Sequence, residues 1–233
     1  MRTRIITLMS FLLMTSLFVS AQKDVTTFLG IPVDGYKSEM KKKLIAKGFT
    51  PTKVRGYDYL EGEFNGTKVD VYIATNNNKV YRIMLADKNT LDEANIKIRF
   101  NNLVGQFERN SRYSSPMEIE DQRISDEEDI SYGMTVKNKI YEASFFQKPD
   151  DSKIDSVALR NNILEAIYEK YTPEEIQNAT DEMKRDIMIS TLAVMEELLR
   201  KKVVWFRIEQ YYNKYYISMY YDNVYNQANG DDL

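Results

Sequence analysis

Apolar and polar residues alternate along three consecutive runs in the first half of the chain. The runs are separated by Asn-Gly at 65–66 and by Asn-Asn-Asn at 76–78, and Asn-Gly between alternating runs is typical of a β-hairpin. We assume a two-residue turn at 65–66 and a pairing of Thr75 with Lys79 around the turn at 76–78. Both registers then place the same apolar residues on one face of the sheet: Leu60, Phe64, Val69, Val71, Ile73, Ile83 and Leu85. Since both turns give the same face, the pattern predicts a three-stranded antiparallel meander with one buried side.

Helical spacing predicts a helix on each side of this meander. Residues 36–47 place Met40 and Leu44 on one face. A second helix is expected to begin with a capping box formed by Thr90 and Glu93, and it carries apolar residues three or four positions apart: Ile96, Phe100, Leu103 and Phe107. We expect both helices to cover the buried side of the sheet.

The rest of the chain has a similar order of hairpins and helices after a break in periodicity at 110–116. Its expected elements are two strands around Asn138-Lys139 (132–136 and 141–145), a helix over 154–171, a helical run over 173–201 interrupted near 178–181, and two strands (203–212 and 215–222). We therefore predict an α+β protein of antiparallel hairpin sheets packed against helices. Its two halves of similar architecture are expected at 22–112 and 113–233.

The final hairpin presents the surface that we expect to bind a partner. A two-residue turn at Asn213-Lys214 directs one set of side chains into the core: Phe206, Ile208, Ile217 and Met219. The opposite face then carries Trp205, Arg207, Glu209, Tyr211, Tyr216 and Tyr220. Aromatic residues and arginine on a solvent-facing sheet are the side chains that dominate binding energy at interfaces. The alternative interpretations are that these cross-strand aromatic pairs only stabilise the sheet, or that a helix covers this face.

The absence of two residue types removes whole classes of chemistry. The 233 residues include no histidine and no cysteine, so Ser-His-Asp triads, thiol nucleophiles and metal sites built on imidazole or thiolate are excluded. Carboxylate, tyrosine and lysine chemistry and oxygen-ligand metal sites remain. We predict no cofactor and no metal site. The densest acidic run, at 126–129, lacks the alternating spacing of a calcium loop and is expected to be a solvated turn. Asp222, Asp231 and Asp232 near the end of the chain are likewise expected to be solvated and not to bind calcium.

The first 21 residues are typical of a secretory signal. Arg2 and Arg4 precede an apolar run that ends in Val19-Ser20-Ala21, so cleavage is expected between Ala21 and Gln22. The apolar run is short for a membrane-spanning helix, which needs about 20 apolar residues. Without a cysteine, the chain cannot follow the lipoprotein route, and we expect a periplasmic or secreted protein with no transmembrane segment after cleavage.

Charge argues against nucleic acid as a partner. The chain has 32 basic and 35 acidic residues, and the predicted signal removes two of the basic ones. Phosphate binding requires a basic stripe, which a mildly acidic chain does not supply.

Asp155-Ser156-Val157 matches a short acid-hydroxyl-aliphatic tripeptide that is O-glycosylated in exported Bacteroidetes proteins, so Ser156 is a weak modification candidate. Asp155 is equally explained as an acid at a helix N-terminus.

Several turn and packing motifs resemble exported proteins of unknown function from gut Bacteroidetes. These motifs are Leu29-Gly30-Ile31-Pro32-Val33-Asp34-Gly35, Lys47-Gly48-Phe49, Gly62-Glu63-Phe64-Asn65-Gly66, Tyr220-Tyr221-Asp222-Asn223 and the end of the chain from Ala228 to Leu233. The resemblance covers most of the mature chain. Because its motifs are turn and packing residues, the resemblance implies no activity.

The helix-then-meander order of the first half is also similar to the β-lactamase-inhibitor-protein fold. The small lipoprotein subunits of the outer-membrane assembly machinery share a related fold. Members of that group are binding modules, although this chain lacks the lipid-anchor cysteine of the lipoproteins and the disulfides of the inhibitors. The resemblance implies a fold class and only indirectly a function.

Two functional hypotheses follow. The first is an exported, non-catalytic binding module that recognises a protein or glycan partner through the outward face of the last hairpin. The alternative is a carboxylate-dependent glycoside hydrolase or another enzyme that acts on polysaccharide, which would require two carboxylates at a set separation across a cleft.

Export is directly testable. Mass spectrometry of the protein purified from its own cells should find an N-terminus at or next to Gln22, because the basic start, apolar run and small residues match the cleavage pattern. A soluble cytoplasmic species that retains Met1 would contradict the prediction.

Overall fold

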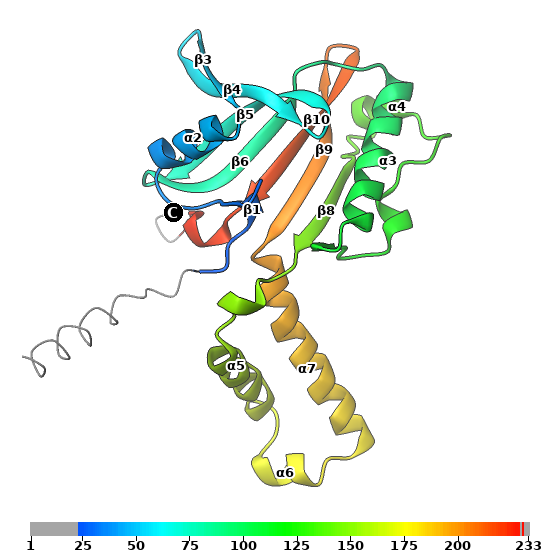
Figure 1. Cartoon of the computed structure of the whole chain (residues 1–233). Helices are drawn as coiled ribbons and strands as arrows, with labels where there is room; N and C mark the ends of the chain where they lie inside the picture. Colours follow the sequence, from blue (N-terminus) through cyan, green and yellow to red (C-terminus); the bar gives the residue numbers. More distant parts are fainter. Residues whose placement is uncertain (1–22, 229, 231–233) are drawn as a thin grey trace, which may run out of the picture.

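The protein is an α+β structure in which an eight-stranded antiparallel sheet packs against helices (Figure 1). The computed structural model describes residues 23–228 and Gly230. The predicted signal at 1–21, its cleavage point at Ala21-Gln22, and the acidic residues Asp231 and Asp232 lie outside the described residues.

The sheet contains strands from both ends of the chain. Its spatial order is β3 (Thr50–Val54), β4 (Tyr57–Phe64), β5 (Thr67–Asn76), β6 (Lys79–Asp87), β10 (Lys214–Asp222), β9 (Val203–Tyr211), β8 (Glu142–Gln147) and β7 (Tyr113–Ser114). A separate small hairpin is formed by β1 (Thr27–Phe28) and β2 (Ile31–Pro32). The helices are α2 (Lys37–Ala46), α3 (Glu93–Arg109), α4 (Ile130–Val136), α5 (Ser156–Tyr168), α6 (Pro173–Gln177) and α7 (Asp181–Arg200).

The two predicted halves share this sheet. Strand β6 of the first half pairs with β10 of the second, with Leu85 opposite Met219 and Ile83 opposite Tyr221. The expected boundary between residues 112 and 113 therefore does not separate two sheets. A single hydrophobic cluster also contains buried residues from both sides of that boundary.

Helices α2 and α3 pack on the same face of the sheet. Met40 and Leu44 of α2 are buried against the first strands, as their spacing predicts. Phe100 of α3 lies 5.0 Å, ring centre to ring centre, from Phe206 of β9. Burial of each such large apolar side chain contributes about 1.5–3 kcal/mol, so this face is the main source of stability.

The register of the meander is partly as predicted. Strands β4 and β5 pair Phe64 with Thr67, as expected for the two-residue turn. In the next hairpin the predicted pairing of Thr75 with Lys79 is wrong, because the turn lies at Asn77-Asn78 and Thr75 pairs with Val80. A bulge beyond this point places an extra residue on β6, so Val71 pairs with Leu85. The buried set is unchanged because the total shift is two residues.

The last hairpin shows the same kind of error. Its turn is formed by Tyr212 and Asn213, and Lys214 pairs with Tyr211, so the predicted turn at Asn213-Lys214 is wrong. Two backbone hydrogen bonds between Tyr215 and Leu91 (2.7 and 2.9 Å) fix the start of β10 from outside the hairpin. Since the shift is again two residues, every side chain keeps its predicted face.

The predicted hairpin around Asn138-Lys139 is wrong in its first strand. Residues Ile130–Val136 form helix α4, because Asp129 caps its start by accepting a hydrogen bond from the amide of Tyr132 (2.7 Å). The buried positions are Ile130 and Gly133, whereas Tyr132 and Val136 are exposed. The second strand exists as β8, and it pairs with β9 and β7.

The predicted capping box at the start of α3 is also wrong. Asp92 is the capping residue, and its carboxylate accepts from the amide of Asn95 (2.9 Å). Glu93 instead accepts a hydrogen bond from the amide of Ile130 (2.8 Å), so it joins α3 to the start of α4. The Glu93 side chain therefore makes a tertiary contact with α4 in place of the local capping contact with Thr90 that the motif predicts.

Helices α5, α6 and α7 form an arm that projects from the end of the sheet (Figure 1). The predicted interruption near 178–181 separates α6 from α7, and Thr172 and Glu175 form a capping box at the start of α6. At the far end of the arm, Asp186 of α7 accepts from Lys170 (3.2 Å) and from the hydroxyl of Tyr171 (3.0 Å). Among the described residues, none of the helices is both long and apolar enough to span a bilayer.

The two faces of the last hairpin should respond differently to truncation. Ile208 is buried in the core, so Ile208→Ala should lower the free energy of unfolding by about 2–5 kcal/mol. Tyr216→Ala, on the opposite face, should cost about 0.2–1 kcal/mol, as expected for a cross-strand pair. Urea unfolding of both variants measures the difference. Equal losses of unfolding free energy would mean that both faces of the hairpin are buried.

Candidate binding face on the outer side of the sheet

The face of the sheet opposite α2 and α3 carries a row of large side chains across five strands. We call the set Tyr59, Tyr72, Met84, Tyr220 and Trp205 the outer row. The register places Tyr72 beside Met84, Met84 beside Tyr220, and Tyr220 beside Trp205. Tyr59 stacks on Tyr72 with ring centres 5.5 Å apart, so the row extends from β4 to β9.

An ion pair holds one end of the outer row in place. Trp205 stacks on Tyr220 with ring centres 3.9 Å apart and planes 15° from parallel. The indole Nε1 of Trp205 donates to Asp222 (2.9 Å), which is buried and also accepts two hydrogen bonds from Arg82 (2.5 and 2.8 Å). The guanidinium of Arg82 lies 5.0 Å from the Tyr220 ring and 5.4 Å from the Trp205 ring.

This arrangement affects the charge of Arg82. The hydrogen bonds to Asp222 raise the pKa of the Arg82 guanidinium despite partial burial. The cation is therefore permanent at any physiological pH. Because the indole and the guanidinium are fixed by the same carboxylate, the surface is held in one conformation before any partner arrives.

Most residues of the predicted binding surface lie together on this face, but Tyr220 is only 6% exposed, so the expectation that its side chain faces solvent is wrong. Arg207 donates to Glu209 (2.6 Å), and the hydroxyl of Tyr220 lies 3.4 Å from the same carboxylate. Tyr216 is the cross-strand partner of Glu209. Tyr211 is at the end of the hairpin, where it is exposed and contacts Tyr212 edge-on.

Sequence reasoning missed the other half of the face. Tyr59, Tyr72 and Met84 alternate with the buried residues of the meander, and that alternation was used only to find the core. It also missed that Arg82 and Asp222 brace Trp205. The alternation could have shown the three outward side chains, but the β6–β10 pairing that brings them next to Trp205 is a tertiary feature.

A second row runs beside the outer row and contains unpaired polar atoms. Asp70, Ala86 and Ser218 are neighbours across β5, β6 and β10. Asp70 Oδ1 and Ser218 Oγ are buried atoms without a hydrogen-bond partner among the described residues. Burial raises the pKa of Asp70 above its ordinary value of 3.8, and Lys88 partly opposes this shift. A buried polar atom left unpaired costs free energy, so these two atoms lower the stability of the folded state.

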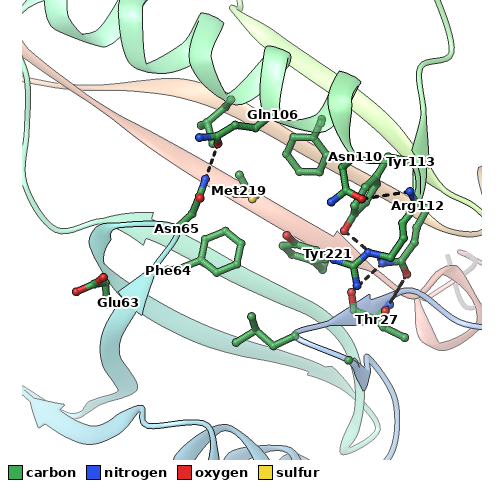
Figure 2. A pocket seen from close by; sticks show the side chains of 15 residues that line it. Thr27, Glu63, Phe64, Asn65, Gln106, Asn110, Arg112, Tyr113, Met219 and Tyr221 are labelled. Atoms are coloured by element: carbon green, nitrogen blue, oxygen red, sulfur yellow. Dashed lines mark hydrogen bonds between the residues drawn. The ribbon is translucent and has the colours of Figure 1, made fainter.

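A cleft of about 400 Å³ lies on the other side of the sheet (Figure 2). Its walls come from α3, the β4–β5 turn and the β1–β2 hairpin, and they include Phe64 and Phe107. Asn65 donates to Gln106 across one end (2.5 Å). At the other end, Gln147 bonds to the backbone of Thr27 through its carbonyl and its amino group (2.7 and 3.2 Å).

The cleft has few titratable groups. Glu63 is the single carboxylate among its described lining residues. Tyr221 is fully buried there, and burial raises the pKa of its hydroxyl well above 10. A glycoside hydrolase requires a second carboxylate across the cleft to act with the first.

The acidic run at 126–129 stabilises local structure. Asp129 caps α4, and Glu128 pairs with Lys139 (2.7 Å) and accepts a hydrogen bond from Tyr141. These contacts lower the pKa of Glu128, with the Lys139 hydrogen bond as the largest cause. In the part of the chain that the structure describes, no group of three or more acidic side chains is arranged to hold a metal ion.

Ser156 is exposed in the first turn of α5. Asp155 caps this helix and accepts hydrogen bonds from the amides of Val157 (3.1 Å) and Ala158 (2.9 Å). Asp155 therefore has a structural role, and the hydroxyl of Ser156 is on an accessible surface.

Comparison with known proteins gives no relative: no family model, curated protein or solved structure matches the chain.

Replacement of Asp70 tests the cost of its buried carboxylate. Since its pKa is raised, the folded state disfavours the ionised form, and Asp70→Asn should be more stable than the wild type at pH 7. The gain should be about 0.5 kcal/mol or less, because solvent still screens this partly buried carboxyl group. It should shrink as the pH falls through the folded pKa and vanish below 3.8, where both states are protonated.

Glu61 provides the control, because its pKa is lowered by a hydrogen bond from Lys88. Glu61→Gln should therefore destabilise the protein at pH 7, and the loss should disappear in acid. Melting temperatures of both variants between pH 3 and pH 7 give the comparison. If Asp70→Asn and Glu61→Gln both raised or both lowered the melting temperature at pH 7, the opposite pKa shifts assigned to the two carboxyl groups would be wrong.

Proposed function

We propose that the protein is an exported binding module of the cell envelope and that it holds a protein or glycan partner on the outer face of its sheet. The observation that carries the proposal is the Trp205–Tyr220 stack, which is braced by Arg82 and Asp222. The outer row is composed of side chains that dominate binding energy when they are covered. Such a row would accept either the apolar side of a sugar ring or the aromatic and proline side chains of a protein.

The polar surroundings of the row support recognition of a specific partner. Arg207 and Glu209 lie on the same face and retain part of their exposure. Stacking would supply affinity, and hydrogen bonds at these groups would select the partner.

The cleft gives less support to the alternative of a polysaccharide hydrolase. It offers Glu63 alone, whereas acid-base cleavage of a glycosidic bond uses two carboxylates. Within this cleft, binding without catalysis is therefore the better match to the described lining residues.

Removal of the indole should abolish most of the affinity. We expect Trp205→Ala to weaken binding to an envelope component by about tenfold or more, because it removes the stacked ring and leaves the surface around Tyr220 open. The experiment is capture from the envelope fraction of the producing cell, followed by titration of the captured partner. A digest of the fraction with protease or with glycosidases distinguishes a protein partner from a glycan.

Two variants control this measurement. Trp205→Phe keeps a stacking ring but loses the hydrogen bond to Asp222, so it should retain more affinity than Trp205→Ala. Tyr132→Ala removes an exposed aromatic ring from α4 and should leave binding unchanged. Equal affinity of Trp205→Ala and the wild type, with both folded, would exclude the outer face as the binding surface.

A further inference from the structure

Helix α7 carries an apolar stripe on the side that does not face α5. Residues Met188, Leu192 and Met195 follow the spacing of a coiled-coil seam, and their exposed fractions are 57%, 56% and 48%. Ile189 flanks them and is 60% exposed. By contrast, Ser190 on the opposite side of the helix is buried. We call Met188, Ile189, Leu192 and Met195 the α7 stripe.

Charged residues at the two ends of the stripe have opposite signs. Arg185 lies one turn before Met188, and Glu196 follows Met195. On a helical wheel, both charges fall on the same side of the helix as the stripe. Arg185 donates to the backbone carbonyl of Asp181 (3.3 Å), and Glu196 pairs with Arg200 of the same helix (2.8 Å).

This distribution of charge is complementary to a second copy in antiparallel orientation. A two-fold axis between Ser190 and Thr191 places Arg185 opposite Glu196 of the partner subunit and Ile189 opposite Leu192 of the partner subunit. The same axis places Asp181 opposite Arg200 of the partner subunit. A parallel pair in register would instead place Arg185 beside Arg185 of the partner subunit, which is repulsive.

We propose that α7 is a self-association surface through which two copies of this chain pair antiparallel. Its position in the arm leaves room for a second helix, because the arm projects away from the sheet (Figure 1). The contact excludes the α7 stripe from water and places Arg185 opposite Glu196 of the partner subunit at both ends. This inference is independent of the proposed function, since the outer row is on a different part of the molecule.

The size of the contact sets the concentration at which it forms. A helix of 20 residues is about 30 Å long and about 10 Å wide. A strip of that size buries roughly 600 Å² in total, which is well below the roughly 1,600 Å² of a standard interface. We therefore expect a weak dimer that forms only at high protein concentration.

Sedimentation of the purified protein between about 1 and 200 μM tests the proposal. The mass should rise from that of one chain towards that of two. Leu192→Glu should hold the protein at one chain over the whole range, because it places charge in the centre of the stripe. Glu169→Arg, at the end of α5 and outside the stripe, should dimerise as the wild type does, and so should Trp205→Ala.

Charge reversal distinguishes the antiparallel pair from other contacts. Arg185→Glu and Glu196→Arg should each weaken dimerisation by about tenfold or more, because each creates two like-charged pairs per dimer. The double variant restores opposite charges and should dimerise within about threefold of the wild type. Within one helix these residues are eleven positions apart, so rescue requires a second copy.

Several results would overturn the proposal. These are a single-chain mass at every concentration, a dimer that is insensitive to Leu192→Glu, and a double charge reversal that fails to rescue. Circular dichroism and melting temperature show whether each variant is folded. Flotation of a single-chain protein with phospholipid vesicles, abolished by Leu192→Glu, would assign the stripe to a membrane surface and would also overturn the proposal.

Discussion

The pairing of β6 with β10 is the contact on which the rest of the structure depends. It joins strands about 130 residues apart in sequence, and it makes one sheet from two ends of the chain. A buried carboxylate lies at each end of the pairing: Asp87 of β6 accepts a hydrogen bond from the backbone amide of Ile217 of β10 (3.4 Å), and Asp222 of β10 pairs with Arg82 of β6. Asp87, at the end of β6, accepts two hydrogen bonds from Arg99 of α3 (2.5 and 2.7 Å), and Asp222 of β10 accepts two from Arg82 of β6. Loss of one partner would leave a buried charge uncompensated, which favours a single arrangement.

The same pairing produces two faces of different character. On one side, Ile83 and Leu85 of β6 join Met219 and Tyr221 of β10 under the helices, and their burial stabilises the fold. On the other side, the pairing brings the tyrosines of the meander next to Trp205. The proposed binding surface is therefore a consequence of how the core is assembled. A change that moved the β6–β10 register by one residue would exchange the two faces.

The errors of sequence reasoning have a common cause. Turn sequences at 76–78 and 213–214 were assigned from local preference, but the register of each hairpin is fixed by a bulge or by a bridge to Leu91. The faces remained correct because the side-chain period of a strand is two and both shifts were two residues. In α4, apolar alternation over a few residues was misread, since a short amphipathic helix and a strand are indistinguishable at that length.

The sequence by itself determined the class of fold, the buried face of the β4–β6 meander and of the last hairpin, and the long helices, because these depend on periodicity within one segment. It also determined which chemistry is absent, since a chain without histidine and cysteine cannot supply imidazole or thiolate. The tertiary structure alone decided that all eight strands share a sheet and that Arg82 and Asp222 brace Trp205. Pairing between distant strands depends on the free energy of the whole core, and no local pattern in the sequence encodes it.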